Sequence, residues 1–283
     1  MFFFLAGYFA SVGSFGTAWL KKRTIRLLFP FLIWSGFYSF TNASMDFGEP
    51  SSYLFGVISG QSAPHLYFVV VLMQLTLITP LLAKSLEYRW GGFVFALTPA
   101  YLVAIYIFVF TTGELPTGYA SLFPAWLVFY YGGMWIHCRA WRPRLKSAII
   151  MTGGALTLSV IEAYALLADG LPVAFATSHV KASSLLFASG AIGVFLALQR
   201  YAVFSNKLLL ELGCDSYGTY FSHMFWALVV AWLANKADLL QIFPNLPLIQ
   251  LVESFIVVAA ALVTIHSARR IFGTKLTSRF LGF

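Results

Sequence analysis

Four cations open the second apolar stretch of the chain, in the sequence LKKRTIRLLFPFLIW from Leu20 to Trp34. Arg23 and Arg26 lie three positions apart and would share one face of a helix. Pro30 cannot donate a hydrogen bond to the carbonyl of Arg26, so we expect the helix to bend there. Arginine pairs with phosphate oxygens through two parallel hydrogen bonds, so this pair is a candidate seat for a phosphate-bearing ligand. The alternative is a signal for membrane topology that contacts anionic lipid, worth about 1 kcal/mol per cation.

Ionisable residues also occur within the apolar stretches, where charge is costly and usually functional. The helical rise of about 1.5 Å per residue places five of them in the outer half of their helices, as one possible polar layer. They are His65, Glu162, Lys181, His223 and Glu253. The alternative is that Glu162 pairs with Lys181 and that the histidines only pack. Histidine titrates near neutral pH, so His65 and His223 are the candidate general bases.

A third polar segment is LGCDSYGTYFSH, from Leu212 to His223. Its polar residues recur every three or four positions, so Ser216, Thr219, Tyr220 and His223 share one face of a helix. Such a stripe must face protein or water rather than lipid. Hydrogen bonds between helices and the lining of a substrate route explain it equally well.

The elements that carry these residues are expected to be membrane-spanning helices. The chain has 283 residues, of which 60% are hydrophobic and only 10% charged, whereas soluble domains carry about 25% charged residues. About nine apolar stretches approach the roughly 20 residues that cross a bilayer. Backbone polar groups in lipid must bond internally, which favours helices. The sequence therefore predicts an all-α, polytopic helix bundle that forms a single domain over residues 1–283.

The basic residues follow the predicted topology. The net charge is +8, and all but two of the 18 Lys and Arg residues fall on one side of the membrane when nine helices alternate. By the positive-inside rule that side is cytoplasmic, so we expect a multi-pass protein of the inner (plasma) membrane, with membrane lipid as a partner and no nucleic acid. Neither a nucleotide-binding loop nor the residue spacing of a metal site is found.

With these segments identified, the chain resembles membrane-bound acyltransferase family 3 over nearly its whole length. FFFLAGYF, from Phe2 to Phe9, is similar to the second helix of that family. The basic segment at Arg23 and Arg26 resembles its R-x-x-R pair, and HLYFVVVLMQLTLITPLL, which starts at His65, resembles its HLWFL…P segment. LGCDSYGTYFSH resembles its LG-x-x-S-x-x-x-Y-x-x-H segment.

The resemblance implies a helix bundle that transfers an acyl group, expected to be acetyl, from cytoplasmic acyl-CoA to a hydroxyl of a sugar, glycan or glycolipid. Polysaccharide O-acetylation is a reaction of this kind. Arg23 and Arg26 would then bind the donor, and His65, Glu162, Lys181, Tyr220, His223 and Glu253 would line the acceptor side. Acyl-CoA such as acetyl-CoA would be a co-substrate, and no permanently bound cofactor or metal is expected.

The chain also departs from the family pattern. Members usually have ten helices, and the first carries a basic residue and, eleven positions later, a histidine thought to be the catalytic base. This sequence starts at the equivalent of the second helix, so the first is expected to be absent. A misplaced start, a fragment and a catalytically altered member each explain this. Two other functions remain open, a transporter or flippase for a glycan-lipid precursor and a non-catalytic membrane protein.

Overall fold

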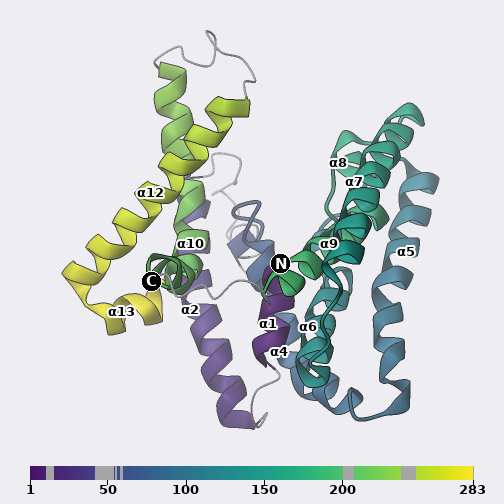
Figure 1. Ribbon diagram of the computed structural model, residues 1–283. Coiled ribbons are helices and arrows are strands. Elements are labelled where there is room, and N and C mark those ends of the chain that lie inside the picture. Colours follow the sequence, from purple (N-terminus) through teal and green to yellow (C-terminus); the bar gives the residue numbers. More distant parts are fainter. Residues whose placement is uncertain are drawn as a thin grey trace. The chain divides into compact units, whose positions relative to one another are not determined.

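The computed structural model describes residues 1–10, 16–41, 54, 56–57, 60–199, 207–236 and 247–282 (Figure 1). Within these ranges the chain forms helices and turns and no strand, which confirms the predicted all-α class. The chain divides into two compact units. Unit 1 contains Met1–Lys22 and Tyr67–Val203, and unit 2 contains Arg23–Leu66 and Phe204–Phe283. The single domain over residues 1–283 stays a prediction.

Unit 1 is a bundle of α-helices joined by short 3-10 turns. Its α7 and α9 run side by side (Figure 1). The elements are α1 (Phe2–Ala10), α4 (Tyr67–Ser85), η1 (Arg89–Ala96), α5 (Leu97–Thr112), η2 (Tyr119–Ser121), η3 (Phe123–Ala125), α6 (Leu127–Arg139), α7 (Leu145–Ala168), α8 (Val173–Ala176) and α9 (Ala182–Leu198).

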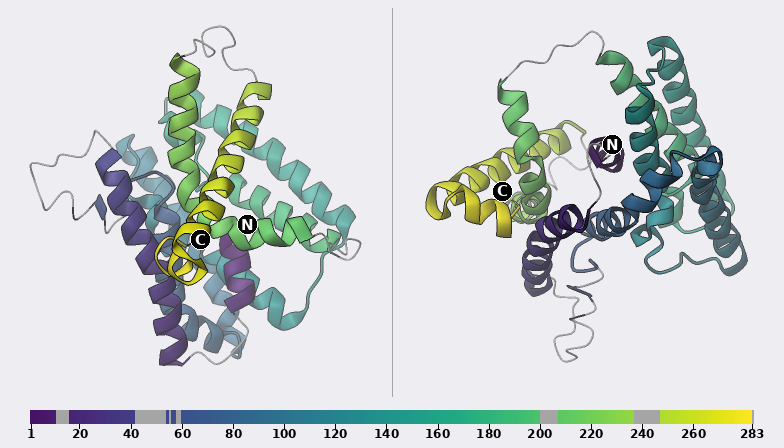
Figure 2. Two further views of the ribbon diagram at one scale, coloured as in Figure 1. Left: turned by 90° about the vertical axis from the view of Figure 1, so that its left-hand side faces the viewer. Right: turned by 90° about the horizontal axis from the view of Figure 1, so that it is seen from below.

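Unit 2 is built on three long helices and a short one. It contains α2 (Thr17–Thr41) from Arg23 onward, α10 (Lys207–Lys236), α12 (Pro247–Phe272) and α13 (Thr274–Phe280). Pro30 lies inside α2, which is one helix on both sides of it. In this unit α10 and α12 pack together (Figure 2). The turn that ends at Leu66 also belongs to unit 2 and carries His65.

Several helices have the length and composition of membrane spans. Among the described residues these are Tyr67–Ser85, Arg89–Thr112, Leu145–Ala168 and Ile249–Phe272, and α9 is a shorter apolar helix. Large apolar side chains cover their outer surfaces, for example Phe110 and Phe255. A soluble protein would bury most of these side chains, whereas a bilayer solvates them. The chain is therefore a multi-pass membrane protein.

Glycines allow α1 and α6 to pack at very short range. A Cβ placed on Gly133 would collide with the carbonyl of Phe4, and one on Gly7 would collide with the carbonyl of Tyr130. Small residues at such contacts are the usual means by which membrane helices approach each other, because lipid gives no hydrophobic driving force for association. The contact fixes α1 against α6 inside unit 1.

The two adjacent glycines of α6 give a matched test of this packing. We expect Gly133→Ala to destabilise unit 1 by about 1–3 kcal/mol, because the new methyl group forces the two backbones apart. A Cβ at Gly132 meets only a ring carbon of Phe95 at 3.8 Å. Gly132→Ala should therefore leave the thermal midpoint in detergent unchanged or raise it. Equal midpoints for the two variants would contradict the close packing.

Candidate functional site

The structure brings two predicted histidines together in unit 2. The ring centroids of His65 and His223 are 5.0 Å apart. The ring of Tyr220 lies 5.3 Å from His65, and that of Tyr38 lies 5.2 Å from it. The turn before α4 supplies His65, α10 supplies Tyr220 and His223, and α2 supplies Tyr38. We call these four residues the histidine cluster.

Hydrogen bonds fix the cluster and set the tautomer of one histidine. The Tyr220 hydroxyl donates to the carbonyl of His65. Nδ1 of His223 lies 2.6 Å from the carbonyl oxygen of Tyr220. A carbonyl only accepts, so Nδ1 carries the proton and neutral His223 keeps its lone pair on Nε2. A neutral imidazole with its lone pair on Nε2 is the form that can act as a general base.

His65 differs from His223 because its two ring nitrogens are buried without a hydrogen-bond partner among the described residues. It lies in the turn before α4, outside the membrane-spanning helices. Burial lowers the pKa of His65, and the nearby His223 lowers it further. His65 is therefore neutral at pH 7 and is a weak base. Of the two predicted base candidates, His223 has the better geometry and His65 is better suited to hydrogen bonding.

Tyr38 belongs to the same cluster, although the sequence did not single it out. Its hydroxyl donates to the carbonyl of Phe221 at 2.6 Å and accepts from the backbone N–H of Phe225 at 3.1 Å. The side chain is buried and ties α2 to α10 next to His65. An aromatic residue in an apolar stretch has many uses, so its spacing alone gave no signal of this role.

The predicted donor residues, Arg23 and Arg26, lie on α2. Arg26 has an electrostatic effect on a tyrosine of α10. Arg26 is exposed and Arg23 is half-buried. The guanidinium of Arg26 interacts electrostatically with the hydroxyl of Tyr217. That hydroxyl is buried and has no hydrogen-bond partner among the described residues. Tyr217 precedes His223 by six residues, which corresponds to about 9 Å along α10.

A buried ion pair lies at the same end of α10. Oδ1 of Asp215 is 2.6 Å from Nη1 of Arg269 on α12, and its Oδ2 is 3.9 Å from Nε2 of His266. The Asp215 side chain is almost fully buried, whereas that of Arg269 is 26% exposed. The pair joins the two helices that carry this side of unit 2. A carboxylate in an apolar stretch and an arginine in a basic cluster were visible in the sequence, but not their pairing.

We expect Asp215→Asn to lower the stability of unit 2 by about 3 kcal/mol, the lower end of the range for breaking a buried ion pair, because Arg269 is partly exposed. The measurement is the thermal midpoint of the purified protein in detergent. Asp169→Asn is the matched control, because Asp169 is exposed at the end of α7 and forms no ion pair in the described part of the chain. A midpoint equal to that of the control would contradict a structural role for the pair.

Two other predicted residues, Glu162 and Lys181, lie in unit 1 and do not pair with each other among the described contacts. Glu162 accepts hydrogen bonds from the hydroxyls of Tyr106 and Ser183 and from the backbone N–H of Ser183 at 3.2 Å. The Lys181 ammonium donates to the carbonyls of Ser159 and Ala176, both at 2.9 Å. Each side chain is thus bound by neutral groups, so the alternative in which Glu162 pairs with Lys181 is not found among the described contacts.

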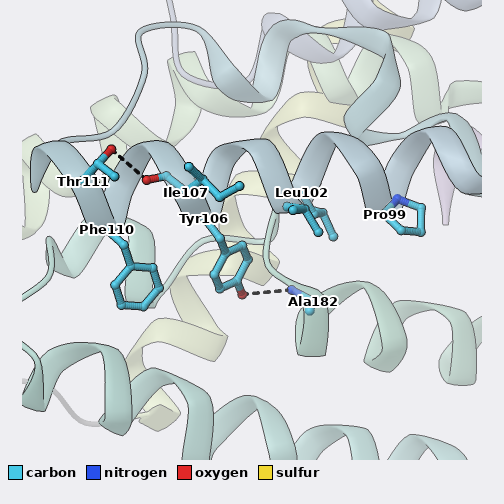
Figure 3. Close-up of a pocket in the computed structure, with 8 residues that line it drawn as sticks. Pro99, Leu102, Tyr106, Ile107, Phe110, Thr111 and Ala182 are labelled. Carbon is cyan, nitrogen blue, oxygen red and sulfur yellow. Dashed lines mark hydrogen bonds between the residues drawn. The ribbon is translucent and has the colours of Figure 1, made fainter.

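Tyr106 also lines an open groove on α5. The groove has a volume of about 580 Å³ and is bounded by apolar side chains such as Leu102 and Phe110 (Figure 3). The Tyr106 hydroxyl accepts a hydrogen bond from the N–H of Ala182 at 3.2 Å (Figure 3). No charged side chain lines the groove. Its surface is suited to hydrocarbon rather than to a sugar.

The remaining candidate, Glu253, is half-buried on α12 in unit 2 and forms no hydrogen bond or ion pair within the described ranges. A common polar layer of Glu162, Lys181, Tyr220 and Glu253 therefore stays a prediction, because these residues are divided between the two units. The described residues also contain no group of three or more His, Cys, Asp or Glu side chains that could hold a metal ion.

Comparison with known proteins gives the family. The model of acyltransferase family 3, described as an acyltransferase domain, matches residues 1–266. No match was found among curated proteins or among solved structures. The matched region includes Arg23 and Arg26 and all four residues of the histidine cluster. The chain therefore belongs to acyltransferase family 3, as the resemblance of its four motifs predicted.

Proposed function

We propose that this protein is a membrane O-acyltransferase. It transfers an acyl group, expected to be acetyl, from cytoplasmic acyl-CoA to a hydroxyl of a sugar, glycan or glycolipid. The observation that carries the proposal is that α10 holds both a residue near the proposed phosphate-binding Arg26 and the proposed base. Tyr217, on which Arg26 acts, and His223, which contacts His65, lie six residues apart. Tyr217, the α10 residue near the proposed phosphate-binding Arg26 of α2, is thus about 9 Å along α10 from the proposed base.

The donor end would be formed by Arg23 and Arg26. Acyl-CoA carries its negative charge on phosphates, which guanidinium groups bind through charge-assisted hydrogen bonds. Arg26 is exposed and has no ion-pair partner among the described residues, so its guanidinium can accept a ligand without breaking an existing pair. With the phosphates held there, the thioester end of the donor would extend along α10 towards His223.

The reaction itself needs one base and one acceptor hydroxyl. Nε2 of His223 removes the proton from the hydroxyl while its oxygen attacks the carbonyl carbon of the thioester. The new C–O bond forms the ester, the C–S bond breaks, and the sulfur of coenzyme A leaves. The His223 imidazolium then returns its proton to that sulfur, so the base is regenerated and no other reactant is consumed.

The remaining cluster residues would position the acceptor. His65 has two buried nitrogens without a described partner, and a buried polar group left unpaired costs about 1–3 kcal/mol. A ligand hydroxyl bound to either nitrogen would recover that cost. The rings of Tyr38 and Tyr220 next to His65 offer apolar faces against which the carbon face of a sugar can pack.

The cellular arrangement follows from the charge pattern. The positive-inside rule favours a bacterial inner membrane with the basic clusters in the cytoplasm, where acyl-CoA is present. The histidine cluster would then lie towards the outer half of the membrane, where a glycan or glycolipid can enter. Glu162, Lys181 and Glu253 remain proposed contributors to this acceptor side.

Label transfer tests the proposal. The purified protein in detergent is incubated with acetyl-CoA labelled in the acetyl group and with a glycan and glycolipid fraction of bacterial envelopes. We expect label in an alkali-labile ester of the acceptor and release of one free thiol for each ester formed. Binding of the glycan fraction without binding of acetyl-CoA would instead indicate a transporter, and label that remains in acetyl-CoA would contradict acyl transfer.

A further inference from the structure

The segment that follows α12 folds back onto α2 and α10 within unit 2. The turn between α12 and α13 is made by Gly273, whose φ of 79° is in the left-handed region that favours glycine. The Nε1–H of Trp34 on α2 then donates to the carbonyl of Leu281 at 3.1 Å. The family match ends at residue 266, so this docked segment lies beyond the matched region.

Arg279 is brought to α2 by this docking. Its guanidinium carbon lies 5.9 Å from the ring centroid of Phe29 and 5.5 Å from that of Phe280, while the two rings are 5.6 Å apart. Phe29 follows Arg26 by three positions, so both lie on one face of α2. Arg279 is therefore held near the position of Arg26 by contacts between a cation and aromatic rings.

Tyr217 on α10 also contacts this segment. A Cβ placed on Gly282 would be 3.1 Å from a ring carbon of Tyr217, so the backbone of Gly282 lies directly against that ring. The Tyr217 hydroxyl is buried, has no hydrogen-bond partner among the described residues, and is affected electrostatically by Arg26. The docked segment thus contacts Phe29 and Trp34 on α2 and Tyr217 on α10, and Phe29 is three positions from Arg26.

Arg26 and Arg279 share two properties. Both are exposed, and neither forms an ion pair with a carboxylate in the described part of the chain. Two cations held on neighbouring elements without a carboxylate repel each other, and an anion bound between them removes that repulsion. The fixed position of Arg279 on two rings also reduces the entropy that it loses when it binds such an anion.

We propose that Arg279 is a third cation of the donor site and binds a phosphate of acyl-CoA together with Arg26. The C-terminal segment of residues 274–282 then forms one wall of that site. This inference rests on the proposed function, because it assumes that acyl-CoA is the donor. Anionic lipid headgroups offer the same phosphate chemistry, so the test must separate the two sources.

The test compares coenzyme A binding by the purified full-length protein and its variants in detergent. We expect Arg279→Gln to weaken binding about tenfold, which is typical for the loss of one charge-assisted contact at an exposed position. Arg279→Lys keeps the charge and should bind within about threefold of the unchanged protein. Arg270→Gln is the matched control, because Arg270 is exposed on α12 and its replacement removes the same charge. Its affinity should not change.

A second readout separates phosphate binding from a structural role. The KM for acetyl-pantetheine, which lacks the nucleotide phosphates, should be the same for Arg279→Gln and the unchanged protein. If Arg279→Gln bound coenzyme A as tightly as the unchanged protein, the inference would be overturned and the proposed function would stay intact. The same holds if Arg279→Gln lost only its binding to phosphatidylglycerol nanodiscs. No binding of coenzyme A by the unchanged protein would overturn both.

Discussion

Replacement of His223 by glutamine is expected to reduce acyl transfer by about 100- to 10,000-fold, the usual contribution of a general base. The reason is geometric. Nδ1 of His223 is occupied by the carbonyl of Tyr220, and the free lone pair is on Nε2. Glutamine can keep the bond to that carbonyl but cannot accept a proton near neutral pH. Transfer of labelled acetyl to the acceptor fraction is the measurement.

The effect should be limited to chemistry. Coenzyme A binding by His223→Gln should equal that of the unchanged protein, because His223 is on α10, whereas the proposed phosphate contacts are on α2 and α13. His179→Gln is the matched control, because His179 is exposed in unit 1 and belongs to no described cluster. Transfer that remains within threefold of the unchanged protein in His223→Gln would assign the base to another residue.

The second large effect is expected at the donor end. The double replacement Arg23→Gln and Arg26→Gln should raise the KM for acetyl-CoA by at least about 100-fold, because hydrogen bonds to charged groups contribute about 1.5–3 kcal/mol each. The KM for acetyl-pantetheine should change little. Initial rates of thiol release at varied donor concentration give both values.

The loss of two positive charges could by itself lower the affinity for the donor, so a control variant must lose the same charge elsewhere. A double replacement of Arg142 and Lys146 by glutamine removes the same two charges from a basic cluster on unit 1. We expect its KM to stay within about threefold of the unchanged protein, because neither residue belongs to the proposed donor site. Equal changes in both double variants would show that Arg23 and Arg26 act only through net charge.

The sequence predicted the all-α membrane class and singled out His65, Tyr220 and His223, three of the four residues that meet in unit 2. A low content of charged residues and long apolar stretches favour a helix bundle in a membrane, because backbone polar groups in lipid must bond internally. That conclusion does not require the three-dimensional structure. The two histidines were identified as base candidates because histidine is rare and titratable within apolar helices. Their contact across α10 and the turn before α4 then follows from the fold.

Other features could not be predicted because periodicity gives the face of one helix and not the face of its neighbour. Pairing of Glu162 with Lys181 was one alternative from the sequence, yet each side chain is hydrogen-bonded to neutral groups instead. A long buried side chain satisfies its polar end with any group in reach, and backbone carbonyls are the most abundant acceptors. The docking of Arg279 against Phe29 likewise depends on the turn at Gly273 rather than on spacing.

The most direct test of the account is an experimental structure of this protein with coenzyme A bound. We expect phosphates in contact with the guanidinium groups of Arg26 and Arg279, and a thiol end that points along α10 to His223. Phosphates bound away from Arg26, or a thiol end that leads away from the histidine cluster, would contradict the central claim that one helix joins the donor site to the base.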